Sequence, residues 1–399
     1  MRPIVLINVT GEDRPGLTAA VSGVLAQAGV TVLDIAQSAV HGVSSLSILV
    51  EVADAAALNE AVLAATQTLG QQVHFTQLDA ADYQRWVEGQ GSQRHIVTLL
   101  SRQVSAEQLQ RVSALTAEQG LSIERIERLS LPVALDAQPA NACIEFSLRG
   151  EPGDAAGLRA EFLRAADELN MDIAFQVDSL QRRHRRLAVF DMDSTLIEAE
   201  VIDELAKAAG IGDKVSAITE RAMRGELDFR ASFKERLALL KGLDVGVLDE
   251  IGASLRLTEG AERLFAELKR LGYKTAILSG GFTYFAKQLQ ARLGIDYVFA
   301  NELAVVDGKV TGVAVEPIVD AQRKADLLRE LAQKEGLQLE QTIAVGDGAN
   351  DLPMLAIAGL GVAFRAKPLV KQSAKQAIST LGLDGVLYLL GVRERDLQR

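Results

Sequence analysis

Two aspartates stand two positions apart at the end of a short apolar run. The run is Leu187 to Phe190, and Asp191 and Asp193 follow it directly. Side chains two apart on an extended chain point to the same side, so these carboxylates are expected to lie together. A carboxylate can attack phosphorus, and a second acid can protonate the leaving oxygen. The pair therefore indicates phosphoryl transfer, assisted by a cation that makes the proximity of two acids tolerable.

Three more polar sites lie where apolar runs end. They are Ser279 with Gly280, Lys324 at a helix start, and Asp347 within GDGAND. Ligands bind beyond the carboxyl ends of strands in an open parallel sheet. Asp347 would join the aspartate pair, and oxygen-only ligands favour a hard ion such as Mg2+. Ser279, main-chain N–H groups near Gly280 and the charge of Lys324 would hold a phosphoryl group.

The elements that must position these residues can be read from the C-terminal half. From Leu187, the apolar runs LAVFDMD, KTAILSG, YVFAN, TIAVGD and GVAF alternate with helical stretches. This alternation predicts a Rossmann-like parallel sheet with helices on both faces, over residues 187–392. A long helical insertion at about 200–255 is interpreted as a cap. The sequence VVDGKV predicts a small antiparallel hairpin.

The N-terminal half repeats one order of elements. Residues 1–82 and 95–180 each follow the order βαββαβ, which predicts two ferredoxin-like domains. The polar stretch Tyr83 to Arg94 is interpreted as a linker. The basic stretch Gln181 to Arg186 is interpreted as a solvated hinge. The predicted fold class is therefore α/β, with two small domains before a capped parallel-sheet domain.

Composition narrows the possible partners. The chain has 399 residues, 48% of them hydrophobic, and a formal net charge of -11. Its length predicts two or three domains, and its acidity disfavours nucleic acid as a partner. Cys143 is the only cysteine, so no intrachain disulfide is possible. The sequence shows no signal peptide and no apolar run that could span a membrane, so we expect a cytoplasmic protein.

The four motifs resemble those of the haloacid dehalogenase superfamily. DMDSTLI, LSGG, Lys324 and GDGAND stand in that superfamily's order and spacing. Together with the cap segment ERAMRGELDFRASFKERLALLKGL, they resemble the phosphoserine phosphatases of that superfamily over residues 187–392. The resemblance implies Mg2+-dependent hydrolysis of O-phospho-L-serine through an aspartyl phosphate, the last step of serine biosynthesis.

The resemblance also assigns roles to individual positions. It implies that Asp191 is the nucleophile and Asp193 the general acid/base. It implies that Mg2+ is held by Asp191, the main-chain carbonyl of Asp193, and Asp347. The remaining assignments are Ser279, Gly280 and Lys324 for phosphate, Glu200 for the substrate ammonium, Arg236 for its carboxylate, Asn350 and Asp351 for support of the site, and Met223 and Phe229 for closure over the pocket.

The start of the chain resembles an ACT domain. The turn GEDRPGL carries this resemblance through Gly11, Asp13, Pro15, Gly16 and Leu17. ACT domains commonly bind amino acids between paired domains. The resemblance therefore implies a regulatory or dimerising front end, a homodimer, and serine as a possible effector. The second copy has SRQVSAEQL at this place, so ligand binding there stays open, as does a purely structural role for both copies.

Two other functions fit part of these observations. A phosphatase of the same superfamily could act on another small phosphomonoester, because Glu200 and Arg236 could also be the solvated face of the cap. A non-catalytic phospho-acceptor with an amino-acid-sensing front end would share the acidic Mg2+ site, the hydroxyl and the lysine. It would have no use for a large cap or for the second acid, Asp193.

Overall fold

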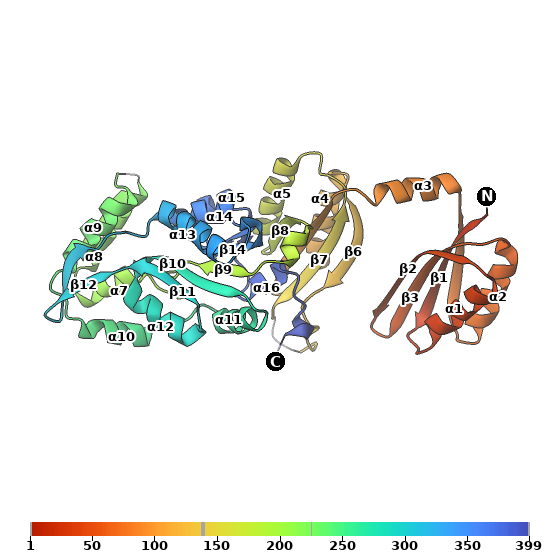
Figure 1. The fold of residues 1–399 in the computed structure, drawn as a ribbon, viewed down its shortest axis with the longest axis horizontal. Coiled ribbons are helices and arrows are strands. Elements are labelled where there is room, and N and C mark those ends of the chain that lie inside the picture. The colour runs from red at the N-terminus through yellow and green to blue at the C-terminus, as the bar shows by residue number, and fades with distance from the viewer. Residues whose placement is uncertain (1, 137–139, 225, 398–399) are drawn as a thin grey trace. The chain divides into compact units, whose positions relative to one another are not determined.

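The structure is a computed structural model that describes residues 2–136, 140–224 and 226–397. The chain divides into two compact units, residues 1–92 and residues 93–399. Figure 1 labels the elements.

The first unit contains one βαββαβ domain, as predicted. Its strands pair antiparallel in the order β2-β3-β1-β4, and its two helices pack on one face. Alternate residues of β1, including Val5, Ile7 and Val9, are buried beneath those helices, which is the period expected for a strand with one covered face. The elements are β1 (Ile4–Glu12), α1 (Leu17–Gln27), β2 (Thr31–Val40), β3 (Val43–Glu51), α2 (Ala55–Gln67) and β4 (Gln72–Leu78).

The segment predicted to be a linker is partly helical. Helix α3 covers Ala80–Gly89, and the Asp79 carboxylate accepts a hydrogen bond at 2.6 Å from the Asp82 N–H at its start. An aspartate at this position satisfies a main-chain donor that the helix itself leaves unpaired. The helix is hard to predict from the sequence because α3 buries no residue, so no pattern of buried positions marks it.

The second unit opens with another βαββαβ domain, which we call the second ACT-like domain. Its sheet has the order β6-β7-β5-β8, equivalent to that of the first copy. The elements are β5 (Arg94–Ser101), α4 (Ala106–Glu118), β6 (Ser122–Arg128), β7 (Ala142–Arg149), α5 (Ala155–Glu168) and β8 (Asp172–Val177).

The C-terminal domain is built on a six-stranded sheet in the order β11-β10-β9-β14-β15-β16, all parallel. Its strand β9 is buried on both sides: Ala188 and Phe190 face one core, Leu187 and Val189 the other. The fold class is confirmed. The strands are β9 (Leu187–Phe190), β10 (Lys274–Phe282), β11 (Tyr297–Asn301), β14 (Thr342–Gly346), β15 (Leu360–Phe364) and β16 (Gln376–Ile378).

Helices cover both faces of this sheet. Residues of α11 and α12 belong to one core, and residues of α13 and α14 to the other. The main helices are α11 (Ala261–Arg270), α12 (Thr283–Leu293), α13 (Ala321–Lys334) and α14 (Leu352–Ile357); shorter ones are α6 (Leu180–Arg183), α15 (Pro368–Ser373) and α16 (Gly385–Leu389).

A helical cap and a hairpin complete the C-terminal domain. The cap consists of α7 (Val201–Ala208), α8 (Gly212–Met223), α9 (Phe229–Leu239) and α10 (Gly246–Ser254). The hairpin joins β12 (Leu303–Val306) to β13 (Lys309–Ala314), and its turn residues Asp307 and Gly308 have φ of 51° and 73°. In Figure 1 the hairpin lies beside α9.

The second ACT-like domain and the C-terminal domain share one hydrophobic core. Leu100 and Cys143 of the first belong to the same buried cluster as Leu381 and Leu387 of the second. The domains also meet where their sheets end, at β8 and β16. The Gln376 side chain accepts from the Phe175 N–H at 2.9 Å and donates to the Phe175 carbonyl at 2.7 Å. These two domains are therefore joined by packing as well as by the chain.

The expectation of a solvated basic hinge is wrong. Arg182 and Arg185 are 5% and 4% exposed. Arg182 pairs with the buried Glu145 at 3.0 Å, and Arg185 donates to the Gln176 side chain at 3.2 Å. Burial and the charge of Arg182 lower the pKa of Arg185 to about 10. A run of arginines gives no sequence signal that separates a solvated hinge from one buried between two domains.

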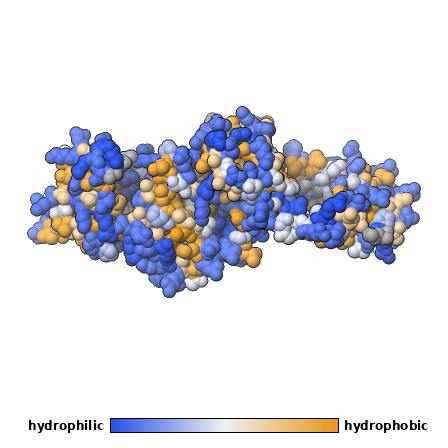
Figure 2. Space-filling view, turned by 90° about the horizontal axis from the view of Figure 1, so that it is seen from above, coloured by the Kyte–Doolittle hydropathy of each residue, from blue (hydrophilic) through white to orange (hydrophobic). Residues whose placement is uncertain are grey.

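Hydrophilic residues cover much of the face shown in Figure 2, with hydrophobic residues in scattered groups. Within the described part of the chain, no helix is long and apolar enough to cross a membrane.

Candidate active site

The site lies at the carboxyl ends of the three central strands. β9 lies between β10 and β14, so the residues after β9 meet residues from both neighbours. Asp191 and Asp193 follow β9, Ser279 lies in β10, and Asp347 follows β14. The predicted juxtaposition of these loops therefore follows directly from strand order.

Asp191 and Lys324 form the buried centre of the site. The Asp191 Oδ1 atom accepts from the Met192 N–H at 2.7 Å, and its Oδ2 atom lies 2.9 Å from Lys324 Nζ. Lys324 Nζ also contacts Asp351 Oδ1 at 2.7 Å. Burial alone would lower the pKa of Lys324, but the charges of Asp191 and Asp351 raise it above its ordinary value. The lysine therefore stays cationic where phosphate oxygens would need it.

Three carboxylates converge in a way that fits a hard divalent cation. Oxygen atoms of Asp191, Asp347 and Asp351 all lie within 4.8 Å of one another. Burial, reinforced by the charge of Asp191, raises the pKa values of Asp347 and of Asp351 to about 7 each. A cation would offset this repulsion, and an all-oxygen set with room for other ligands is typical of Mg2+. Asp351 thus belongs to the acidic group itself, whereas the sequence indicated only a supporting place.

The Asp193 side chain contacts the start of the cap. Its Oδ1 atom accepts from the Val201 N–H at 3.2 Å, at the start of the cap. Burial, with the charges of Glu200 and Asp191, raises the pKa of Asp193 well above its usual value. A raised pKa suits a carboxyl that has to donate a proton to a leaving group.

The β10 segment gives the site a tightly held turn. Ser279 is buried, and its Oγ accepts from the Gly281 N–H at 2.9 Å. The buried Asn301 donates to the Gly280 carbonyl at 2.8 Å and accepts from the Val319 N–H at 2.8 Å. Asn301 thereby connects this turn to the segment that leads into α13 and Lys324.

Two opposite charges stand at the cap side of the site. Glu200 directly precedes α7, and its carboxylate accepts from Ser194 Oγ at 2.8 Å. Burial and the charges of Asp191 and Asp203 raise the pKa of Glu200, against the Ser194 hydrogen bond and Arg236. Arg236 lies in the last turn of α9; burial lowers its pKa, while Asp203, Glu200 and Asp193 act in the opposite direction.

The cap reaches the β10 turn through Phe229. Its ring stacks on Phe233 with centroids 6.2 Å apart and lies against Gly280, where an added Cβ would be 2.9 Å from Phe229 Cζ. Asn350 lies in the turn after β14 beside Gly348, next to the acidic group. Met223 ends α8, and its side chain lies outside the described part of the chain.

Sequence reasoning missed three polar residues that hold this geometry. Thr195 is fully buried and donates from Oγ1 to Asp347 Oδ1 at 2.9 Å. Ser194 holds Glu200, and Asn301 holds Gly280. Ser194 and Thr195 lie within the DMDST motif, so a search for hydroxyl donors beside the acids could have found them. Asn301 has no such signal, because its partners are distant in sequence and are main-chain groups.

In the first ACT-like domain, the GEDRPGL turn has the shape its glycine predicts. Gly16 precedes α1 with φ of 96°, a conformation that favours glycine. The Asp13 N–H donates to the Gly42 carbonyl at 2.8 Å, which ties this turn to the β2–β3 connection.

The fold and the site together define a haloacid dehalogenase-like hydrolase. The sequence pattern of that family matches residues 188–356, and ACT domain patterns match residues 3–76 and 93–176. The chain belongs, within that class, to the phosphoserine phosphatase family. A phosphoserine phosphatase of Streptomyces coelicolor is 42% identical, and one of Mycobacterium tuberculosis 40%; each alignment covers 99% of this chain and 94% of the relative.

Solved structures agree with this family. A probable phosphoserine phosphatase from Vibrio cholerae superposes with a TM-score of 0.59 at 35% identity, over 76% of this chain and 89% of its own. A hydrolase of the same superfamily from Salmonella enterica serovar Typhi gives a TM-score of 0.65 at 30% identity, over 76% of this chain and all of its own.

Proposed function

We propose that this chain hydrolyses O-phospho-L-serine to L-serine and phosphate, the last step of serine biosynthesis, with Mg2+ as cofactor. The observation that carries the substrate is the pair Glu200 and Arg236 beside the Asp191 centre. A zwitterionic phosphomonoester needs an acid for its ammonium, a base for its carboxylate and a cationic site for its phosphate. These two residues and Lys324 supply those three groups.

In the first half of the reaction, Asp191 attacks phosphorus and forms an aspartyl phosphate as the bond from phosphorus to the serine oxygen breaks. Asp193, whose pKa is raised by burial and by the charges of Glu200 and Asp191, donates a proton to the departing oxygen. In the second half, Asp193 takes a proton from the water that attacks the aspartyl phosphate. Phosphate leaves, and Asp191 is regenerated.

The remaining groups hold charge and orientation. Ser279, the main chain near Gly280 and Lys324 would bind the phosphoryl oxygens. We assign the metal to Asp191, the main-chain carbonyl of Asp193, Asp347 and Asp351, with Asn350 supporting the site. When bound, Mg2+ supplies charge neutralisation between the acids and the phosphoryl group. Phe229 and Met223 would close the cap over the substrate and exclude bulk water.

The test is phosphate release from O-phosphoserine with and without Mg2+, beside a panel of phosphothreonine and sugar phosphates. We expect Mg2+-dependent turnover with phosphoserine preferred. Asp191→Asn should abolish turnover and leave no phosphorylated enzyme. Turnover of a sugar phosphate instead would support the other small-phosphomonoester function, and a phosphoaspartate lasting minutes to hours would support a phospho-acceptor.

We also propose that the first ACT-like domain forms a homodimer and senses an amino acid, with serine as the candidate. β2 is an edge strand, and Val32, Ile35, Val40 and Val43 on and beside it are 50–75% exposed. An unpaired edge with exposed apolar residues favours a second copy of the chain as the partner.

Light scattering tests this proposal. It should give a dimer that Ile35→Asp weakens, while Val306→Asp on the β12–β13 hairpin leaves the dimer intact. Added serine should change phosphate release. We also propose that the phosphatase activity takes place in the cytoplasm.

A further inference from the structure

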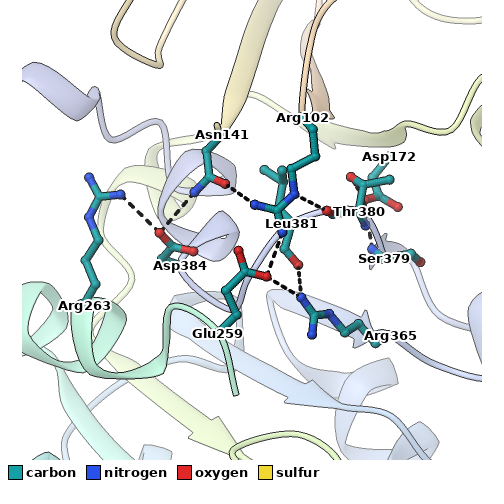
Figure 3. Close-up of polar contacts among 10 residues, drawn as sticks. All are labelled: Arg102, Asn141, Asp172, Glu259, Arg263, Arg365, Ser379, Thr380, Leu381 and Asp384. Carbon is teal, nitrogen blue, oxygen red and sulfur yellow. Dashed lines mark hydrogen bonds and ion pairs between the residues drawn. The ribbon is translucent and has the colours of Figure 1, made fainter. Parts of the chain in front are cut away.

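The turn after the first strand of the second ACT-like domain contacts the C-terminal domain. In the first copy, the equivalent turn is GEDRPGL. In the second, Arg102 occupies it and donates from Nε to the Thr380 carbonyl at 2.9 Å and from Nη2 to Glu259 Oε2 at 2.7 Å (Figure 3). Arg102 Nη1 also donates to the Asn141 side chain at 3.2 Å. This turn is therefore bound to the C-terminal domain through Thr380 and Glu259.

The groups around Arg102 are themselves held in place. Asp172 Oδ2 accepts from the N–H groups of Ser379 and Thr380, each at 2.8 Å, so the carbonyl that Arg102 contacts belongs to an anchored segment. Figure 3 shows Asn141 reaching Asp384, at 3.1 Å. A guanidinium held by two other acceptors, the Thr380 carbonyl and the Asn141 side chain, offers a defined anchor for Glu259.

Two arginines, Arg102 and Arg365, contact the Glu259 carboxylate. Arg365, which follows β15, donates from Nη2 to the same Oε2 atom at 2.7 Å. Burial is incomplete, since the Arg102 and Glu259 side chains are 37% and 46% exposed, so this contact contributes little to stability. The contact matters because it fixes the position of the segment that ends at Glu259.

Glu259 ends the segment that returns from the cap. This segment pairs with the outgoing arm: the Glu198 N–H donates to the Arg256 carbonyl at 3.0 Å, and the Thr258 N–H donates to the Leu196 carbonyl at 2.9 Å. Ile197 and Leu257 form the bridge between these hydrogen bonds. The outgoing arm begins three residues after Asp193 and ends two residues before Glu200. We call these paired arms, residues 196–198 and 256–258, the cap hinge.

We propose that Arg102 and Glu259 are positioning residues, through which the second ACT-like domain holds the cap hinge in register. The hinge in turn sets where Glu200 and the cap stand relative to Asp191 and Asp193. This inference rests on the proposed function for its effect on phosphoserine, but its structural part is independent of substrate. Arg365 holds Glu259 as well, so loss of Glu259 should have a larger effect than loss of Arg102.

The first test is hydrogen exchange on the full-length protein, which needs no substrate. In Arg102→Ala and Glu259→Ala, the amides of Glu198 and Thr258 should exchange about five- to tenfold faster than in the wild type, because their hydrogen bonds open locally more often. Glu259→Gln keeps the shape of the side chain and should show the same change more weakly.

The matched control is Arg393→Ala. Arg393 pairs with Glu127 of the second ACT-like domain at 2.8 Å across the same domain contact, with exposures of 34% and 24%. Among the side-chain contacts of the described residues, its partner is Glu127 and not a hinge residue. It should leave the Glu198 and Thr258 amides unchanged. Equal exchange in all variants and the wild type would overturn the proposal, as would an equal acceleration in Arg393→Ala.

The second test separates positioning from general damage. Glu259→Ala should raise KM for phosphoserine about fivefold, since Glu200 binds the substrate ammonium, with little change for p-nitrophenyl phosphate, which has neither ammonium nor carboxylate. The double variant Arg102→Ala/Glu259→Ala should be no worse than Glu259→Ala. An equal loss on both substrates would contradict the positioning role. If wild type does not hydrolyse phosphoserine but the exchange result holds, only the proposed function fails.

Discussion

Asp193 is packed against the main chain of Gly281, and this contact has no room for a side chain. A Cβ at Gly281 would stand 2.5 Å from Asp193 Oδ2 and 2.7 Å from Met192 Cε. Gly281→Ala should therefore displace Asp193, the proposed proton donor, and lower kcat about tenfold or more, with a smaller effect on KM. Steady-state kinetics with phosphoserine provide the measurement.

The neighbouring Gly280 is the control for that prediction. A Cβ there would meet Phe229 of the cap rather than Asp193. Gly280→Ala should then hinder cap closure and raise KM more than it lowers kcat. Identical kinetic changes in the two variants would show that neither glycine has the separate role described.

The metal site should compete with protons. Asp347 and Asp351 have pKa values near 7 in the folded chain, above the 3.8 of an unperturbed aspartate. Between about pH 4 and pH 7 the folded state therefore binds more protons than the unfolded state, so the metal-free protein loses stability as pH rises through this range. Mg2+ requires the ionised acids, so it should raise the melting temperature more at pH 8 than at pH 6.

Differential scanning calorimetry with and without Mg2+ at the two pH values checks this. Asp347→Asn removes one titrating ligand and should reduce both the Mg2+ effect and its pH dependence. An equal Mg2+ shift at pH 6 and pH 8 in the wild type would mean that these acids do not bind the ion.

At the scale of elements, the cap and the hairpin form one assembly. The Gly242 N–H donates to the Val310 carbonyl at 2.8 Å, and the Val310 N–H donates to the Leu243 carbonyl at 2.9 Å. The cap loop before α10 thus pairs with β13 through a single antiparallel bridge between Asp244 and Lys309. Helix α9 is further connected to the segment before α13 by Arg230, which contacts Asp320 at 2.6 Å and Glu316 at 3.4 Å.

Arg230→Ala should weaken this closed arrangement. We expect KM for phosphoserine to rise about two- to fivefold with kcat little changed, because surface ion pairs are individually weak. The wild-type KM should rise with salt, and that of the variant less so. Arg221→Ala, which removes a 2.9 Å contact to Glu235 within the cap, is the comparison. A KM increase of the same size there would assign the effect to the cap's own stability.

The strands that end at residues of the site were predicted better from the sequence than the segments that join domains. Asp191, Ser279 and Asp347 each end an apolar run, so strand order alone brings them together. The hydrogen bonds of Asn301 and Thr195 depend on three-dimensional proximity, which no local pattern encodes. β16 was missed because three residues are too few to show a period. The burial of Arg182 and Arg185 depends on a second domain, which a basic run cannot indicate.

At the scale of the whole molecule, the two compact units predict where the chain can be cut. A fragment of residues 93–399 retains the shared core and should fold, bind Mg2+ and hydrolyse phosphoserine. A fragment of residues 187–399 would expose Leu381, Leu387 and other residues that pack on the second ACT-like domain. It should aggregate or melt well below the longer fragment, as measured by light scattering and calorimetry. A short fragment as stable as the long one would contradict the shared core.

The Gln376 side chain has a consequence for how the molecule avoids unwanted association. Its amide bonds to both the N–H and the carbonyl of Phe175, the pattern that a neighbouring strand would otherwise offer. The edges of β8 and β16 thereby face each other instead of facing other molecules. The docking of the two domains thus keeps both strand edges from pairing with other protein chains in a crowded cell. Any transient separation of the domains would expose both edges at once.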